Sequence, residues 1–359
     1  MMPILYAANE TAFDTLGLGV LNDCISCEVY EELNGEFELT MRYPVNGVLF
    51  DELAVDKIIL AKPSQTRQPQ AFRIYCVKKS SNASAVIRAE HISYRLKDIP
   101  VKNFGASTLG RAIEAISKNS LTENPFTIST TLDTAAVKTF SFGEPRNLKS
   151  ILIDEENSFL TAYGGEFEFD NYSVILKEQR GADNGFKIAY AKNMTGIVCE
   201  ESVEDVYTAC VAFYRNTDAD GYPVLVVGEL QTIETHLSYS RAIIYDATDE
   251  HFDYIPPVEH LNISARDYLA TLDNEPYLMV SVDFVNLGDS EEYKQFRQLE
   301  VVDLGDVVKI YHPDYKIDIA ARVVATTYNV LLERYSSVDV GRRKTNIADS
   351  LSGLLAKLV

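Results

Sequence analysis

The residues from Cys24 to Tyr43 alternate between apolar and polar side chains on both sides of an Asn34-Gly35 pair. Alternation with a period of two indicates half-buried β-strands, and a turn sequence between two such runs indicates a hairpin. One apolar row consists of Ile25, Cys27, Val29 and Leu33, and the other of Phe37, Leu39, Met41 and Tyr43. A two-residue Asn-Gly turn would send these rows to opposite faces of the hairpin. A three-residue connection with Gly35 left-handed in a bulge instead pairs Val29 with Leu39, and we predict this form.

Further short strands follow in the first part of the chain. Apolar or alternating runs at 57–61, 71–78 and 85–89 are separated by turn sequences at 44–47 and 80–82. Several short strands within so few residues are typical of a small barrel or sandwich. We therefore predict a first β-barrel-like domain over residues 1–98.

The hydrophobic period changes after Pro100. A helical stripe is formed by Leu109, Ala112, Ile113 and Ile116, and Ser107 and Thr108 are its candidate N-caps. A second helix is predicted from Leu148, Ile151, Leu152 and Phe159, ending at Gly164-Gly165. A hairpin follows, in which a two-residue Asp170-Asn171 turn would pair Phe169 with Tyr172 and Phe167 with Val174. Residues 99–195 are accordingly predicted to form an α+β domain.

Strand patterns dominate again from Gly196 onwards. They cover 203–214, 224–229, 277–285, 307–311 and 322–332, and one helix interrupts them with Leu261, Ala265, Tyr268, Leu269 and Leu272 on one side. We predict a second β-barrel-like domain with an inserted helix at 196–340 and an amphipathic C-terminal helix at 341–359. The overall fold class is then α+β and mostly β, with two small β-barrels around an α+β domain.

Charge and composition exclude several classes of protein. The chain of 359 residues has 33 Lys and Arg against 53 Asp and Glu, a formal charge of −20. Duplex DNA is bound largely by basic side chains that neutralise phosphates, so this acidity argues against a general DNA-binding surface. The first basic residue is Arg42, and the longest uncharged apolar stretches, 206–214 and 222–228, are too short to cross a bilayer. We expect a soluble protein without a secretory signal.

The cysteines and the short motifs point to no catalytic or metal site. The five cysteines are an odd number, which indicates reduced thiols, and the Cys24–Cys27 pair has no second pair to complete a zinc site. Asn216, Asp218, Asp220 and Gly221 match half of a calcium loop, but Val227 stands where a bidentate Glu is needed, so we expect a hairpin tip. We predict no catalytic residue, no metal site and no cofactor.

Several segments together resemble one known family. They are Glu31–Leu39, Phe72–Tyr75, Ala89–Tyr94, Gly164–Asn171, Arg180-Gly181, Tyr190–Ile197, Leu304–Val308, Tyr328 and Gly341. In this order, over nearly the whole chain, they resemble the tail-tip hub family of long-tailed phages and prophages, also called the prophage tail-associated lysin or tail endopeptidase family.

The resemblance implies a fold similar to the baseplate hub of contractile tails, with two related β-barrels and neighbouring α+β domains. It implies a homotrimeric ring that caps the sixfold tail tube and leaves a channel for the tape measure and then DNA. The implied partners are the tail tube or distal tail protein, the tape measure protein, and DNA that passes without sequence-specific binding. The implied location is the virion tail tip, after synthesis in the bacterial cytoplasm.

The enzyme label of this family does not transfer to the chain. Peptidoglycan cleavage in the family resides in domains appended after the hub, and nothing in this sequence matches a peptidase site. We expect a structural protein and not an enzyme. Two alternatives stay open: a tail-associated cell-wall endopeptidase, and a receptor- or glycan-binding tip protein whose many Tyr rings suit carbohydrate faces.

Overall fold

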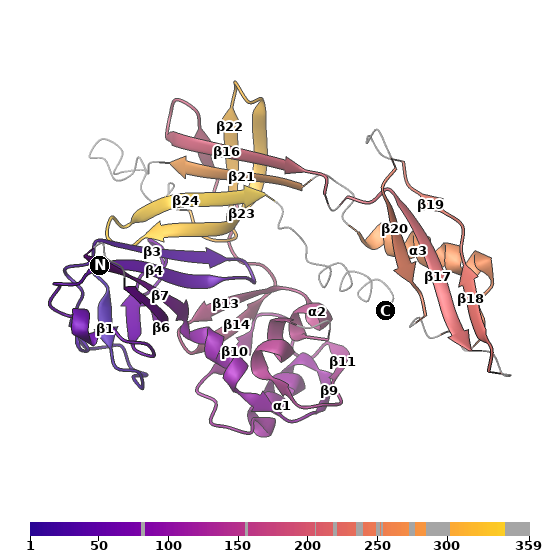
Figure 1. The fold of residues 1–359 in the computed structure, drawn as a ribbon, viewed down its shortest axis with the longest axis horizontal. Helices are drawn as coiled ribbons and strands as arrows, with labels where there is room; N and C mark the ends of the chain where they lie inside the picture. The colour runs from indigo at the N-terminus through magenta and orange to yellow at the C-terminus, as the bar shows by residue number, and fades with distance from the viewer. Residues whose placement is uncertain are drawn as a thin grey trace. The chain divides into compact units, whose positions relative to one another are not determined.

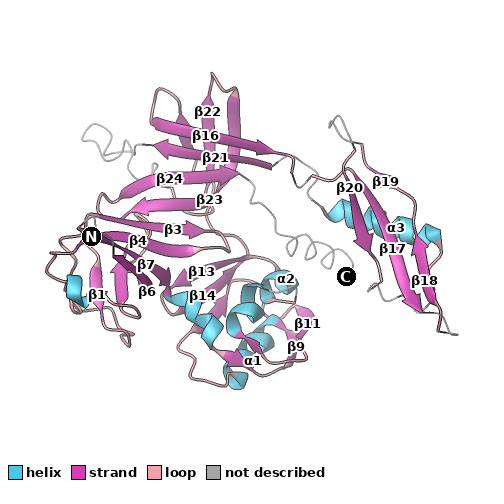
Figure 2. Cartoon of the chain, in the orientation of Figure 1, coloured by secondary structure: helices cyan, strands magenta, loops and turns pink. Residues whose placement is uncertain are grey.

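The structure is a computed structural model, and it describes residues 1–79, 83–154, 157–204, 206–217, 221–234, 240–248, 252, 254–272, 277–284 and 302–341. The predicted mostly β class is confirmed, because strands outnumber helices throughout (Figure 2). The chain divides into two compact units. Unit 1 contains residues 1–199 and the described residues from 279 to 341, and unit 2 contains the described residues of 200–278. The finer division into four segments stays a prediction.

The elements of unit 1 fall into an N-terminal, a middle and a C-terminal group. The N-terminal group is β1 (Ile4–Tyr6), β2 (Gly19–Val20), β3 (Ser26–Glu32), β4 (Phe37–Pro44), η1 (Phe50–Glu52), β5 (Ile58–Ala61), β6 (Gln70–Lys79), β7 (Ser84–His91) and η2 (Ile92–Asp98). The middle group is β8 (Pro100–Val101), β9 (Gly105–Thr108), α1 (Leu109–Asn119), β10 (Thr127–Thr130), β11 (Val137–Ser141), β12 (Arg146–Asn147), η3 (Ser150–Asp154), α2 (Phe159–Tyr163), β13 (Glu166–Asp170) and β14 (Ser173–Lys177). The C-terminal group is β15 (Phe186–Ala189), β16 (Met194–Ser202), β21 (Tyr277–Phe284), β22 (Val307–His312), β23 (Ile317–Asn329) and β24 (Arg334–Gly341).

One large sheet connects the two ends of the chain. Its main path is β16-β21-β24-β23-β3-β4-β7-β6-β5-β1-β2, with β22 beside β23 and β15 beside β22. The C-terminal strand β23 runs antiparallel to the N-terminal strand β3, with Tyr328 opposite Val29 (Figure 1). The strand pairings of the described residues close no barrel. The sequence predicted two separate barrels, whereas β3 pairs along both of its edges and so joins the two strand groups into one sheet.

The predicted register of the first hairpin is confirmed, but the turn is built differently. Val29 lies opposite Leu39, and the Glu32 N–H donates to the Glu36 carbonyl at 2.8 Å, which leaves three residues, 33–35, in the connection. The left-handed residue is Asn34, with φ of 51°, and not Gly35 as predicted. Asn34 tolerates this conformation, and its side chain donates to the Gly165 carbonyl and accepts from the Phe167 N–H at 2.7 Å. The turn is therefore held by a strand more than a hundred residues away.

The helix predicted at 109–116 is confirmed, and the one predicted across 148–159 is wrong. Thr108 caps α1 by accepting a hydrogen bond from the Arg111 N–H. In place of the second helix there is a short π-helical turn, η3, and a separate helix α2. The break has a local cause, because the Ser158 side chain accepts from the Thr161 N–H and thereby starts α2 anew. Gly164 ends α2 with φ of 72°, as predicted.

The second hairpin, β13–β14, differs from its prediction by one residue. Phe169 lies opposite Val174 and Asp170 opposite Ser173, so Asn171 and Tyr172 form the turn. Asn171 is left-handed, with φ of 50°, and its side-chain oxygen accepts from the Ala71 N–H at 2.8 Å. This contact with β6 fixes the turn one residue later than local pairing rules suggest.

Unit 2 is a small sheet with one helix packed on it. Its elements are β17 (Ala209–Thr217), β18 (Pro223–Val227), β19 (Gln231–Thr232), β20 (Ala242–Asp246) and α3 (Val258–Thr271). Leu261, Ala265 and Leu269 of α3 pack on Cys210, Ala212 and Tyr214 of β17, which confirms the predicted helix and its buried side. The strand predicted from Val203 begins only at Ala209. β17 and β18 pair antiparallel as far as Thr217 and Pro223, which confirms the predicted hairpin, whereas its tip with Asp218 and Asp220 lies outside the described residues.

Two further observations complete the fold. None of the helices that the structure describes is long and apolar enough to cross a membrane. The predicted C-terminal helix, apart from Gly341 at the end of β24, lies outside the described residues.

Candidate functional site

A buried cluster of opposite charges joins distant parts of unit 1. The Glu31 side chain on β3 pairs with Arg67 from the β5–β6 loop and with Arg180 from the segment after β14. The nitrogen-to-oxygen distance from Arg180 to Glu31 is 3.0 Å. Burial alone would raise the pKa of Glu31, but the two guanidinium groups outweigh burial and lower it. Glu31 is therefore a buried anion between two cations.

A second charge pair continues this cluster into the C-terminal strands. The Arg322 guanidinium on β23 donates two hydrogen bonds, of 2.6 and 2.9 Å, to the Glu166 carboxylate on β13. Glu166 also accepts from the backbone N–H of Arg180 at 2.7 Å. A bidentate pair fixes the relative orientation of its partners as well as their distance. The cluster thus holds β3, the β13–β14 hairpin and β23 in one arrangement.

Two glycines allow the backbone to cross beside this cluster. Gly181 and Gly305 have φ of +71° and +91°, a region that favours glycine. A Cβ atom on Gly181 would lie 2.1 Å from the carbonyl carbon of Gly305, and one on Gly305 would lie 2.5 Å from the carbonyl oxygen of Arg180. Two sequence blocks that carried the family resemblance, Arg180-Gly181 and Leu304–Val308, therefore meet in one close contact.

His91 links the N-terminal strands to the tip of the β13–β14 hairpin. Its Nδ1 accepts from the Ser93 N–H at 3.2 Å, and its Nε2 lies 3.2 Å from the Gln70 side-chain oxygen. An accepting Nδ1 places the proton of the neutral ring on Nε2, which donates to Gln70. The same oxygen accepts from the Asn171 N–H at 2.7 Å. Burial, followed by the charge of Arg67, holds the pKa of His91 well below its usual range, so this link is neutral.

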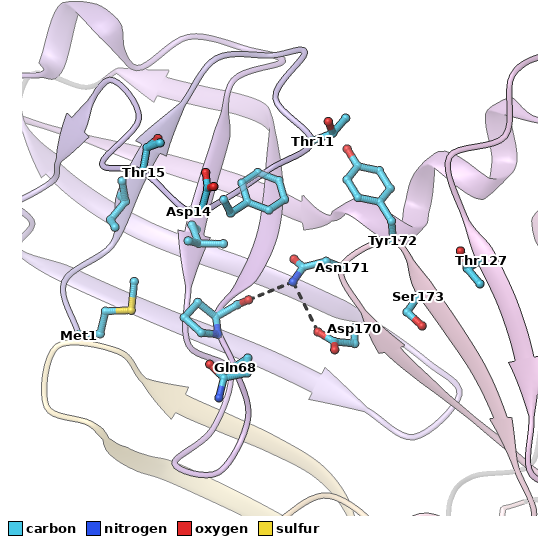
Figure 3. Close-up of a pocket in the computed structure, with 14 residues that line it drawn as sticks. Met1, Thr11, Asp14, Thr15, Gln68, Thr127, Asp170, Asn171, Tyr172 and Ser173 are labelled. Carbon is cyan, nitrogen blue, oxygen red and sulfur yellow. Dashed lines mark hydrogen bonds between the residues drawn. The ribbon is translucent and has the colours of Figure 1, made fainter.

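An open cleft of about 820 Å³ lies between the 11–15 loop and the hairpin tip (Figure 3). Thr11, Asp14 and Thr15 lie along one wall, and Tyr172, Ser173 and Thr127 along the other. The walls are connected by the Tyr172 hydroxyl, which donates to the Glu10 carbonyl at 3.5 Å. Asn171 donates to the Pro69 carbonyl and to Asp170, as the dashed lines mark. The cleft is therefore shaped by contacts between segments far apart in the sequence.

The sequence predicted no site residues, and it contained a signal for only one of these features. Glu31 stands in the apolar row of Cys27 and Val29, and a carboxylate on a buried face needs a partner. Nothing local indicates that the partners are Arg67 and Arg180. Both thiols of the Cys24–Cys27 pair are free, and the described part of the chain contains no group of three metal-ligating side chains.

Comparison with known proteins gives matches by structure and not by sequence. No family model matches the chain, and no curated protein matches its sequence. The prophage tail protein gp18 from Listeria monocytogenes EGD-e is 16% identical, with 99% of each chain covered and a TM-score of 0.55. The 43 kDa tail protein of prophage MuSo2 from Shewanella oneidensis is 9% identical, with 97% of this chain and 99% of that one covered and a TM-score of 0.58. A tail protein from Neisseria meningitidis MC58 is 8% identical, with coverages of 97% and 98% and a TM-score of 0.57.

The chain has the fold of prophage tail proteins. The predicted resemblance is confirmed at the level of the fold. Because these matches cover at least 97% of the chain, the tail-protein fold takes in both units. The cluster around Glu31 lies where β3 and β23 meet the β13–β14 hairpin.

Proposed function

We propose that this protein is a structural hub at the tail tip of a phage or prophage. The observation that carries the proposal is the match, over nearly the full length, to three prophage tail proteins from different bacteria. The buried charge cluster supports a structural role. Separating a buried ion pair leaves an unpaired buried charge, which is strongly unfavourable, so the cluster opposes movement of β3, the β13–β14 hairpin and β23 relative to one another.

In the proposed assembly three copies form a ring on the sixfold tail tube. Each copy would contribute two β-rich lobes, one built on β1–β7 and one on β15, β16 and β21–β24, so that six lobes face the tube. The second lobe consists of six strands in the order β15-β22-β23-β24-β21-β16. The pairing of β3 with β23 joins the first lobe to the second.

The proposed partners are the tail tube or distal tail protein, the tape measure protein and the exiting DNA. The formal charge of −20 supports a channel wall that repels DNA and lets it slide. A lumen lined mainly with Lys and Arg would contradict this part of the proposal.

The test is the stoichiometry of the assembled tail tip. Tails would be purified from the bacterium that carries the phage, and the mass of the tip complex and the position of the labelled chain would be measured. We expect three copies per tail, and any other number rules out the trimeric hub.

The rival enzymatic interpretation, a tail-associated cell-wall endopeptidase, needs a separate assay. The purified chain would be incubated with labelled peptidoglycan, with and without zinc. We expect no released fragments, and release that a chelator abolishes would replace the structural role with an enzymatic one.

A further inference from the structure

The cleft between the 11–15 loop and the β13–β14 hairpin presents polar side chains that nothing else in the described structure engages. Thr11, Asp14, Gln68, Thr127 and Ser173 line it, and within the described ranges their side chains make no hydrogen bond or ion pair. By contrast Asp170 and Asn171, at its base, are both occupied by neighbouring groups. The cleft therefore combines a fixed base with free donors and acceptors on its walls.

Two aromatic rings in the cleft are held firmly in place. Phe13 and Tyr172 both pack against the core cluster of Ile4, Tyr6 and Leu60. The Phe13 ring stands edge-on to Tyr6 at 5.3 Å between centroids, and the Tyr172 ring lies 5.4 Å from Phe126. Both rings are only partly buried, so each keeps apolar surface that a ligand can cover.

The charges of the cleft exclude anionic ligands. Its lining includes the carboxylates of Asp14 and Asp170 but, among the described residues, no Lys, Arg or His side chain. The terminal amine of Met1, which also lines the cleft, is paired with Glu333. A phosphate or carboxylate ligand would face two negative charges without a compensating donor of positive charge, and the net charge of −20 adds to this repulsion.

A cationic ligand is disfavoured for a different reason. Asp170 already accepts a hydrogen bond of 2.8 Å from Gln70, which leaves Asp14 as the free carboxylate. Asp14 is exposed, and an exposed ion pair contributes little because water and salt screen it. The remaining free groups are hydroxyls and an amide, which are neutral.

We propose that this cleft binds a neutral oligosaccharide. The C–H faces of sugar rings would cover the surfaces of Phe13 and Tyr172, and the sugar hydroxyls would bond to Asp14, Thr127 and Gln68. The volume of about 820 Å³ lies in the range of about 300–1,000 Å³ in which small ligands bind. This inference does not depend on the hub function, since a hub can assemble without binding sugar.

The test uses the full chain and defined trisaccharides. Saturation-transfer NMR and titration calorimetry would measure binding of maltotriose, mannotriose and chitotriose, with trilysine and tripolyphosphate as the cationic and anionic probes. We expect at least one neutral trisaccharide to bind and neither charged probe to do so. Binding of trilysine or tripolyphosphate with no binding of the three sugars overturns the proposal.

Matched variants locate the binding. Asp14→Ala and Thr127→Ala remove free groups from opposite walls, and each should weaken sugar binding at least fivefold. Asp98→Ala removes an exposed carboxylate outside the cleft and should leave the affinity unchanged. Thermal melting shows that each variant is folded. An affinity that stays the same in both cleft variants, or binding of none of the three sugars, contradicts the site.

Discussion

Gly181 is a residue whose replacement tests the backbone crossing directly. Gly181→Ala places a Cβ atom 2.1 Å from the backbone of Gly305 and also strains a φ of +71°. We expect a loss of about 3 kcal/mol or more in the free energy of unfolding, measured by urea denaturation.

Gly185 provides the matched control for this variant. Its φ of +72° is nearly identical, but a Cβ atom there would meet nothing within 4 Å. Gly185→Ala should therefore cost only the conformational strain, about 1 kcal/mol. Equal losses in the two variants would show that the close approach to Gly305 is unimportant.

Glu31→Gln tests the buried charge cluster at the same scale. The variant leaves the Arg67 and Arg180 guanidinium groups without their buried anion, and we expect a loss of about 3–5 kcal/mol at pH 7. Glu36→Gln, at an exposed position next to β4, should change stability by less than about 0.5 kcal/mol.

The lowered pKa of Glu31 adds a pH dependence to this prediction. A carboxyl whose folded pKa is below its unfolded value of about 4.3 gives its full contribution above that pH and loses it as the pH falls through the folded pKa. The stability gap between wild type and Glu31→Gln should therefore narrow on acidification below about pH 4. A gap that widens or stays constant in urea titrations from pH 7 to 3 would contradict the assignment.

At the scale of elements, α1 depends on one capping residue that the sequence left undecided. Thr108 accepts from the Arg111 N–H, whereas Ser107 only contacts the Arg111 guanidinium at the surface. Thr108→Ala should lower the free energy of unfolding by about 1 kcal/mol, and Ser107→Ala by a few tenths. Equal effects in denaturation experiments would mean that the cap is shared.

The elements show which predictions local patterns can support. The β3–β4 register and α1 follow from hydrophobic periods that neighbouring residues carry themselves, and both were predicted correctly. The turn residue Asn34 and the shifted β13–β14 turn were missed, because each is fixed by hydrogen bonds to segments about a hundred residues away. The candidate cleft could not be predicted for the same reason, because its walls come from segments that lie far apart in the sequence.

At the scale of the whole molecule, the pairing of β3 with β23 could not be predicted from the sequence. Residues about 300 positions apart lie side by side there, and no alternation pattern states which of many strands will be the neighbour. The prediction of two separate closed barrels was wrong because β3 and β23 join the two strand groups into one sheet, although most of the predicted strands are present.

The place of unit 2 in the chain yields a prediction for the whole molecule. β16 and β21 are neighbours in the large sheet and run in opposite directions, so the chain leaves and re-enters unit 1 at adjacent strands (Figure 1). Unit 2 has its own core, built from Tyr214, Leu261 and Leu269 among others. An insertion with a separate core at such a site is expected to fold independently of its host.

Excision of unit 2 tests this independence. Replacing residues 203–276 with a short Gly-Ser turn should leave unit 1 with cooperative thermal unfolding, and the fragment 200–278 should show helix and strand signals by circular dichroism. Leu261→Asp in the fragment removes a fully buried core side chain and serves as the unfolded control. If the excised unit 1 loses cooperative unfolding while the fragment resembles its Leu261→Asp control, the two units fold only together, and the tail-protein fold is a single cooperative structure.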